Sequence, residues 1–288
     1  MLWTPGNEFN YRTDNFGATF TDGGLGTNSP GHANANQKGA NTNIISGIAE
    51  DCYGLAICFS GGNSNGVSRQ CMVDILIDPA AGAGNAGSSW SVLIANLAAK
   101  SSAFTAGAPG VWYYFPIYLA AGTAIGTAHQ DSSATTQALR VAIRVYGKPS
   151  RPDLLKVGTR VQTLGATTAT TVGVTVTPGT SAMGSYSATL GTLNFDAWWW
   201  QLGILSTDGT MTANSYLFDV AANATNKIMC MEGVQHTVVG TVEQSGKSAF
   251  GAEVPYRMIS SGQDVYVRGA GNAAPDSGMS AIVYALGS

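Results

Sequence analysis

A serine lies between two glycines in residues 62–66, which match the pattern G-x-S-x-G. In hydrolases with a nucleophile elbow, this pattern exposes the serine on a sharp turn between a strand and a helix. Here residues 67–77 are expected to form a strand, so the helix that the motif needs does not follow. No acid and histidine are placed convincingly downstream either. The pattern therefore predicts a β-turn around Ser64 and no nucleophile.

A second glycine pattern, G-x-G-x-x-G, occupies residues 82–87 and follows an expected strand. A dinucleotide site would need these glycines to open a helix, with an acid about 20 positions later. Residues 100–110 contain no acid. The corresponding loop of the second half, residues 221–226, has no glycine although its flanking strands persist. We interpret residues 82–87 as a flexible loop and expect no cofactor.

Metal-ligand spacing is absent from the sequence. The histidines His32, His129 and His236 are isolated from one another, and the cysteines form no C-x-x-C pair. His129 and Asp131 are interpreted as a polar pair in a loop. We therefore predict no metal site.

Four acids recur at corresponding places in the two halves: Asp51, Asp74, Asp196 and Asp219. Paired carboxylates of this kind can cleave glycosidic bonds. However, two of them, Asp74 and Asp219, lie beside apolar residues within expected strands, so each should point to the solvent face or hydrogen-bond a neighbouring turn. A structural role is therefore favoured. We expect no catalytic residue and predict that the chain is not an enzyme.

Cys58 and Cys71 lie at equal distances from the turn at residues 64–65. They would face each other if the two flanking strands formed a hairpin. In many sandwiches, however, successive strands belong to opposite sheets. The sequence leaves open whether these two cysteines form a disulfide or are a pair of buried free thiols.

The three consecutive tryptophans at residues 198–200 cannot all face one way, because adjacent strand residues point to opposite sides of a sheet. If Trp198 and Trp200 are core residues, Trp199 is exposed. It then serves a subunit interface or a sugar-binding platform, or the chain's own loops cover it. Trp112 and Tyr114 are the other aromatic residues that could stack on a sugar ring.

A cluster of cations surrounds residues 148–153, which form a linker that contains two prolines. This cluster is either a docking surface for an acidic neighbour or a solvated junction. Its members are Arg140, Arg144, Lys148, Arg151, Lys156 and Arg160.

The pattern of strands that must position these residues occurs twice in the sequence. Residues 53–59 alternate apolar and other residues as residues 198–204 do, and residues 71–75 match residues 216–220. The final stretch, residues 139–147, matches the chain end. We infer an internal duplication into two tandem domains. The predicted boundaries are 1–148 for the first domain with its N-terminal arm, 149–154 for the linker and 155–288 for the second domain.

Each copy contains about eight short expected strands and no long segment of helical period. This pattern predicts an all-β chain of two antiparallel β-sandwiches of the jelly-roll kind. Pro116 and Pro255 each interrupt an apolar stretch, which an edge strand or a bulge tolerates and a central strand resists.

Only 11% of the residues are charged and the net charge is −3, against about 25% charged residues in typical domains. Such a chain generates no field that would attract nucleic acid or an anionic membrane. No apolar run is long enough to span a bilayer, and residues 1–6 do not resemble a secretory signal. We expect a product that is made in the cytoplasm, is not exported by the general secretory route, and binds neither nucleic acid nor membrane.

Short motifs carry a resemblance to a known group of proteins: W-T-P-G at residues 3–6, T-P-G-T at 177–180, and F-P-I at 115–117 with the following Gly122. With the tandem plan, the chain resembles uncharacterised structural proteins of tailed bacteriophages, such as head-decoration, head-fibre base or minor tail proteins. The resemblance implies a virion location, with capsid, portal, collar or tail proteins as partners.

We expect this role to be filled by a symmetric homo-oligomer. The alternative is a carbohydrate-binding module that recognises a host surface glycan from a phage tail or spike.

Overall fold

The structure, a computed structural model, describes residues 11–16, 20–21, 24–60, 69–101, 111–132, 138–150, 156–166, 168–169, 173–186, 188–206, 214–223, 225–239, 242–243, 249–250, 258–272 and 279–288. Every regular element in these ranges is a β-strand, and nearly all strand pairs are antiparallel. The predicted all-β class is therefore confirmed. Across the same ranges, no helix is long and apolar enough to cross a membrane.

The strands of the first half are β1 (Arg12–Asp14), β2 (Phe20–Thr21), β3 (Gly24–Leu25), β4 (Thr27–Pro30), β5 (Thr42–Ile45), β6 (Gly54–Ser60), β7 (Arg69–Asp78), β8 (Ser91–Ser101), β9 (Val111–Phe115), β10 (Ala124–Asp131) and β11 (Ala138–Tyr146). Those of the second half are β12 (Arg160–Leu164), β13 (Val174–Val176), β14 (Gly179–Thr180), β15 (Ala188–Thr192), β16 (Ala197–Ser206), β17 (Asn214–Ala222), β18 (Ile228–Val239), β19 (Val242–Glu243), β20 (Ala249–Phe250), β21 (Asp264–Gly271) and β22 (Met279–Gly287).

The first half contains two main sheets that pack face to face. One sheet has the order β1-β11-β6-β9, with β4 as a further neighbour of β11, and the other has the order β5-β10-β7-β8. Alternate residues of β6 and β7, such as Ile57 and Ile75, enter the core between the sheets. The first half is therefore a sandwich, as the alternation predicts.

The second half has the same strand order. Its first sheet runs β12-β22-β16-β20 with β13 beside β22, and its second runs β14-β21-β17-β18-β19 with β15 beside β21. The pairing of β14 with β21 is parallel. This shared order agrees with an internal duplication, whereas the duplication itself and the boundary at 149–154 stay predictions.

The correspondence of the halves extends to single hydrogen bonds between backbone groups. Cys52 and Leu119 exchange two such bonds, of 2.7 and 3.0 Å, in the first half. Ala197 and Ile259 exchange two, of 2.9 and 2.8 Å, at the corresponding place in the second half. Residues in the two halves can therefore be compared one by one.

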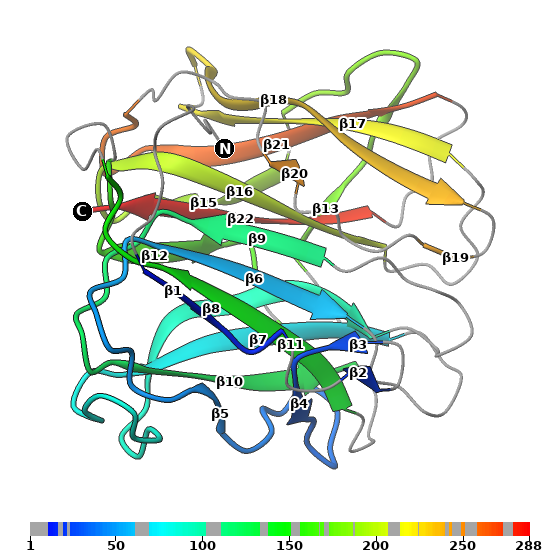
Figure 1. Cartoon of the computed structure of the whole chain (residues 1–288). Coiled ribbons are helices and arrows are strands. Elements are labelled where there is room, and N and C mark those ends of the chain that lie inside the picture. Colours follow the sequence, from blue (N-terminus) through cyan, green and yellow to red (C-terminus); the bar gives the residue numbers. More distant parts are fainter. Residues whose placement is uncertain are drawn as a thin grey trace.

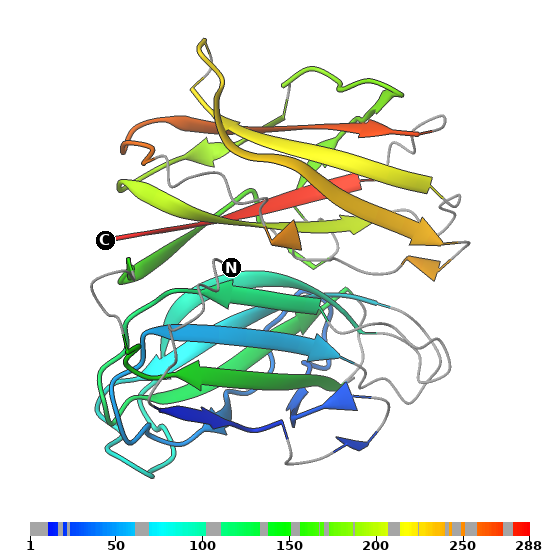
Figure 2. The same ribbon diagram turned by 45° about the horizontal axis from the view of Figure 1, so that its top comes forward.

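The two halves meet in a buried junction, with the yellow-to-red half above the blue-to-green half (Figures 1 and 2). The edge strands β8 and β9 of the first half contact the outer face of the sheet that contains β16 and β22. Strand β22 is consequently buried on both faces. Ile282, Tyr284 and Leu286 join the core of the first half, while the residues between them line the core of the second half.

The hydroxyl groups of Tyr284 and Tyr113 are hydrogen-bonded within this junction. The Tyr284 hydroxyl accepts the Ala98 N–H at 2.7 Å and donates to the Asn96 carbonyl at 2.9 Å. The Tyr113 hydroxyl donates to the Ala98 carbonyl at 2.7 Å. Beside them, a Cβ added to Gly203 would lie only 2.8 Å from the Ala98 Cβ. The junction is thus packed as closely as a domain core.

The arrangement of β6 and β7 shows whether Cys58 and Cys71 face each other. The two strands lie in different sheets, so the hairpin that would place these residues opposite each other does not form. The two thiols form no disulfide. Burial raises the pKa of Cys58 to about 12, so its thiol stays protonated at neutral pH.

The edge prediction from Pro116 is confirmed, because this residue directly follows β9, the last strand of its sheet. Pro255 lies outside the described residues.

Candidate binding surfaces

The recurring acids Asp51 and Asp196 bind backbone amides of equivalent turns. Asp51 Oδ1 accepts the Ala121 N–H at 2.9 Å, and Asp196 Oδ1 accepts the Ser261 N–H at 2.8 Å. Each turn leads into the strand that crosses the middle of its sheet, β10 or β21. These two carboxylates therefore hold the fold, as expected.

The other recurring acids, Asp74 and Asp219, bind the next strand where it bulges. Asp74 Oδ1 accepts the Asn96 N–H at 2.8 Å, and Asp219 Oδ1 accepts the Gly233 N–H at 2.9 Å. Asn96 and Gly233 both have positive φ, 54° and 64°. Asp219 also receives two hydrogen bonds, of 2.8 and 3.0 Å, from Arg268. A carboxylate beside a bulge is therefore another shared structural device.

His129 and Asp131 lie in a strand, whereas the sequence analysis placed them in a loop. Both lie within β10, and each side chain is about 1% exposed. His129 Nδ1 lies 3.2 Å from the hydroxyl of Ser29. Over the described part of the chain, no group of three or more His, Cys, Asp or Glu residues could hold a metal ion.

The glycine-rich segment at residues 82–87 closes a loop between two strands, β7 and β8. Gly84 N–H donates to the Gly47 carbonyl at 2.7 Å, which ties the loop to the segment after β5. The helix that a dinucleotide site requires does not follow these glycines, because β8 begins at Ser91. Residues 62–66, with the G-x-S-x-G pattern, lie outside the described residues.

Trp199 is half-buried at the junction, whereas simple alternation predicts exposure. A bulge between Ala197 and Trp199 interrupts the pairing of β16 with β22, so Trp198 joins the first half's core and Trp199 packs against it. Trp199 Nε1 donates to the Tyr114 carbonyl at 3.0 Å, and the two rings meet edge to face at 6.0 Å. Trp199 therefore contributes to the contact between the halves.

Tyr114 and Trp112 lie on the same face of β9. Tyr114 is only 6% exposed, which leaves no open ring face for a sugar. Trp112 is half-buried and meets the ring of Phe16 edge to face at 5.5 Å. The structure thus brings Trp199 and Tyr114 together, as part of the junction.

The predicted basic cluster is divided by the fold. Arg140 is 9% exposed, so it offers little surface to a partner. Arg144 Nε lies 3.4 Å from Asp14 Oδ2, and its guanidinium lies 4.3 Å from the centre of the Phe16 ring. Arg144 is therefore held by residues of its own half.

The remaining cations lie beside aromatic residues of the second half. Lys156 lies 4.7 Å from the centre of the Trp198 ring, and Arg160 lies 4.5 Å from that of Phe195. Lys148, Lys156 and Arg160 are exposed. Arg151 lies outside the described residues. Among the five cations in the described ranges, Arg140 and Arg144 are thus set apart from the exposed Lys148, Lys156 and Arg160.

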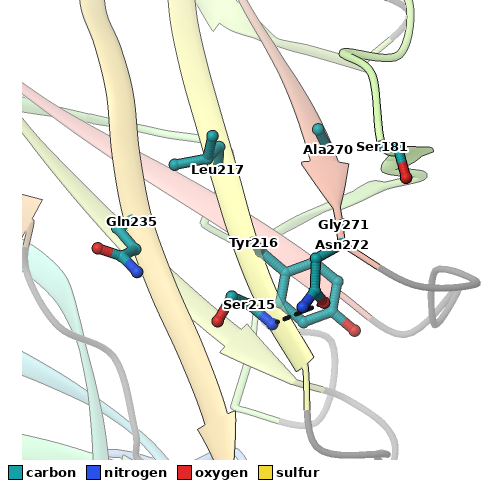
Figure 3. A pocket seen from close by; sticks show the side chains of 8 residues that line it. All are labelled: Ser181, Ser215, Tyr216, Leu217, Gln235, Ala270, Gly271 and Asn272. Atoms are coloured by element: carbon teal, nitrogen blue, oxygen red, sulfur yellow. Dashed lines mark hydrogen bonds between the residues drawn. The ribbon is translucent and has the colours of Figure 1, made fainter.

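A shallow groove of about 360 Å³ opens on the outer face of the second half, across β17, β18 and β21 (Figure 3). Its apolar wall is Leu217, a large side chain that is 43% exposed. The residues that line it are Ser181, Ser215, Tyr216, Leu217, Gln235, Ala270, Gly271 and Asn272. The sequence analysis did not identify this groove, although an apolar Leu217 at an outward position was a signal.

The equivalent place in the first half is covered by the chain itself. Leu217 pairs with Ala270 and Gln235 on the neighbouring strands. The corresponding centre is Met72, which pairs with Gln130 and Ala98 and is 0% exposed.

A segment of the second half lies on this covered place. Ala169, itself 0% exposed, donates its N–H to Gln130 Oε1 at 3.3 Å. This place is thus buried within the chain in the first half, whereas its counterpart around Leu217 is open.

Comparisons with known proteins do not assign the chain to a family. No family model matches it, and a search of the curated proteins finds no match. Among solved structures, a chain of broad bean stain virus is similar at 8% identity and a TM-score of 0.35, covering 100% of this chain and 92% of that one.

Two further solved structures are similar over most of this chain. A chain of tripeptidyl peptidase 2 has 8% identity and a TM-score of 0.25, covering 91% of this chain and 22% of that one. The N-terminal CBM22-1-CBM22-2 tandem domain of Paenibacillus barcinonensis Xyn10C has 9% identity and a TM-score of 0.24, covering 91% and 78%. Likeness at this level carries no argument about function.

Proposed function

We propose that this chain is a structural protein of a bacteriophage particle. It decorates the capsid or forms part of a collar, head fibre or tail, and it acts by binding other virion proteins without catalysis. The sequence resemblance to phage structural proteins supports the virion role. The recurring acids support a binding role, because all four hold turns or bulges.

The groove around Leu217 is the observation that carries the proposal. Equivalent positions in the two halves differ in cover: Met72 is 0% exposed and Leu217 is 43% exposed. Burying a leucine side chain stabilises a contact by about 1.5–3 kcal/mol relative to leaving it in water. An apolar residue held at this position is thus suited to being covered by another chain.

We take the occupant to be an extended segment of small residues from a neighbouring virion protein. The argument is the first half, where the chain itself buries the equivalent place and the backbone of Ala169 hydrogen-bonds to Gln130. In the open groove, Ala270 stands at the place of Gln130, and the exposed side chain of Gln235 offers an amide on the other neighbouring strand, β18. A neighbour's segment would lie across β17 and β18 and hydrogen-bond through its backbone to Gln235.

The test is incorporation into particles of the phage that encodes the chain. With the chain's own gene deleted and a plasmid copy supplied, wild-type protein should be present at a fixed copy number after a high-salt wash. Leu217→Asp should lower that number at least about tenfold, because a charge replaces the leucine contact.

Val92→Asp is the matched control, since Val92 is also an exposed apolar strand residue, at 56%, but lies away from the groove. It should incorporate normally. A chain that is absent from washed particles contradicts the virion role. Binding to a glycan array that Trp112→Ala abolishes would instead support the carbohydrate-binding alternative.

A further inference from the structure

Lys38 lies in a cluster of polar groups on the outer face of β7 and β8. Its Nζ lies 2.8 Å from Asp74 Oδ1, 2.9 Å from Asn96 Oδ1 and 3.1 Å from the Met72 carbonyl. The Lys38 side chain is 28% exposed and that of Asp74 13%. The Lys38 amine is therefore in contact with both a carboxylate and a carboxamide, and it is largely buried.

We propose that Lys38 and Asn96 join in an intramolecular amide bond, with Asp74 as the proton carrier and ammonia as the leaving group. The site is thus a self-modification site, and its product is a covalent cross-link between the segment before β5 and strand β8. This inference does not depend on the virion role.

Two hydrogen bonds and the burial of Lys38 prepare the reacting groups. The oxygen of Asn96 that Lys38 contacts also accepts a hydrogen bond of 3.2 Å from Gln130 Nε2, which withdraws electron density from the amide carbon. Asp74 is fixed by the Asn96 N–H at 2.8 Å. Burial lowers the pKa of Lys38, and Asp74 opposes this effect. A larger fraction of neutral, nucleophilic amine is therefore present than at a solvated lysine.

The step balances without an outside reagent. Asp74 takes one proton from the Lys38 ammonium, and the neutral amine attacks Asn96 Cγ to form a C–N bond. Negative charge develops on Asn96 Oδ1, where the Gln130 N–H donates. The attacking nitrogen then loses a second proton, which passes through Asp74 to the original amide nitrogen. That nitrogen leaves as NH₃, the carbonyl re-forms, and Asp74 keeps the first proton.

The second half has the same bulge without the reacting pair. Asp219 binds the Gly233 N–H there, and its other oxygen is engaged by the guanidinium of Arg268. Glycine supplies no carboxamide at this position, and a guanidinium is a far weaker nucleophile than an amine. The second half therefore forms the same bulge with the carboxylate alone, without an amine or a carboxamide beside it.

Intact-mass spectrometry of the denatured, purified full chain tests the proposal. The wild type should be lighter than its sequence mass by one ammonia molecule, and tryptic digestion should yield one branched peptide that joins residues 38 and 96. Lys38→Arg keeps a cation for Asp74 but removes the amine, so it should have its full sequence mass. Asp74→Asn should also abolish the loss of ammonia.

A wild-type chain at its full sequence mass overturns the proposal. So does a loss of water in place of ammonia, which would indicate a bond between Lys38 and Asp74. A loss of ammonia without the branched peptide indicates cyclisation at another asparagine and equally refutes it. The wild-type measurement alone decides the question even where a variant fails to fold.

Discussion

Tyr284→Phe tests whether the junction is a true core between the two sandwiches. The ring stays, so its packing against Tyr113 and Phe115 is kept. The hydroxyl is lost, and with it the partner of the Ala98 N–H and of the Asn96 carbonyl. Ala98 is 0% exposed, so water cannot replace that partner without opening the junction.

The expected loss follows from the desolvation of that amide. A buried donor left without a partner costs about 1–3 kcal/mol. The Asn96 carbonyl adds less, because its residue is only partly buried. We expect Tyr284→Phe to lower the free energy of unfolding by about 2–3 kcal/mol. Urea unfolding followed by tryptophan fluorescence measures this loss, with one transition for the whole chain because both halves share the junction.

Tyr53→Phe is the control, since Tyr53 is half-buried and packs edge to face on Tyr118, away from the junction. It should change the free energy of unfolding by less than about 0.5 kcal/mol. If Tyr284→Phe lowers the free energy of unfolding by less than about 0.5 kcal/mol, the Tyr284 hydroxyl does not stabilise the junction and the reasoning is refuted. Two separate transitions, only one of which responds to the substitution, would refute the single unit.

Three further changes test other parts of the structure. Gly203→Ala places a Cβ 2.8 Å from that of Ala98, so overpacking should cost about 1–3 kcal/mol in the same unfolding assay; an unchanged midpoint would contradict the close contact. Asp219→Ala leaves the Gly233 N–H and Arg268 without their carboxylate, which is 2% exposed, and should cost about 3–5 kcal/mol by urea unfolding; a loss like that of an exposed acid would mean that the ion pair is loose. Hydrogen bonds from the Ser89 and Ser88 amides lower the pKa of Asp78 below its ordinary value of 3.8. The stability from this lowered pKa is therefore present above pH 3.8 and is lost as pH falls through the lower, folded value. Asp78→Asn should flatten this acid limb in a series of unfolding curves, and an unchanged limb would contradict the assignment.

The sequence is sufficient to predict the sandwich and the role of the recurring acids. Alternation at period two shows which strands have a buried face, and repetition of Asp51 as Asp196 points to a need of the fold. The structure supplies a turn amide for each of these two acids. A pattern that repeats despite different surroundings is thus readable from the sequence.

The surroundings of Trp198 and Trp199 could not be predicted from the sequence, because they depend on how the two halves pack against each other. Alternation assigns Trp198 to the core of its own sandwich and Trp199 to solvent, but one bulge in β16 turns both toward the first half. A bulge inserts one residue and leaves no clear mark in the hydropathy pattern. The close spacing of the cations in sequence likewise does not show their surroundings: Arg140 is buried, Arg144 lies on Phe16 and Lys156 lies on Trp198.

The differences between equivalent positions carry the information about function. Arg144 of β11 corresponds to Tyr284 of β22, since Ala56 and Gln201 occupy equivalent places beside them. Arg144 is bound by Asp14 and Phe16 on its own half, whereas Tyr284 is buried by the other half. The outer faces of the two equivalent sheets are therefore buried by different parts of the chain. By the same reasoning, the proposed contact with another virion protein rests on the difference between the exposed Leu217 and the buried Met72 at the equivalent position.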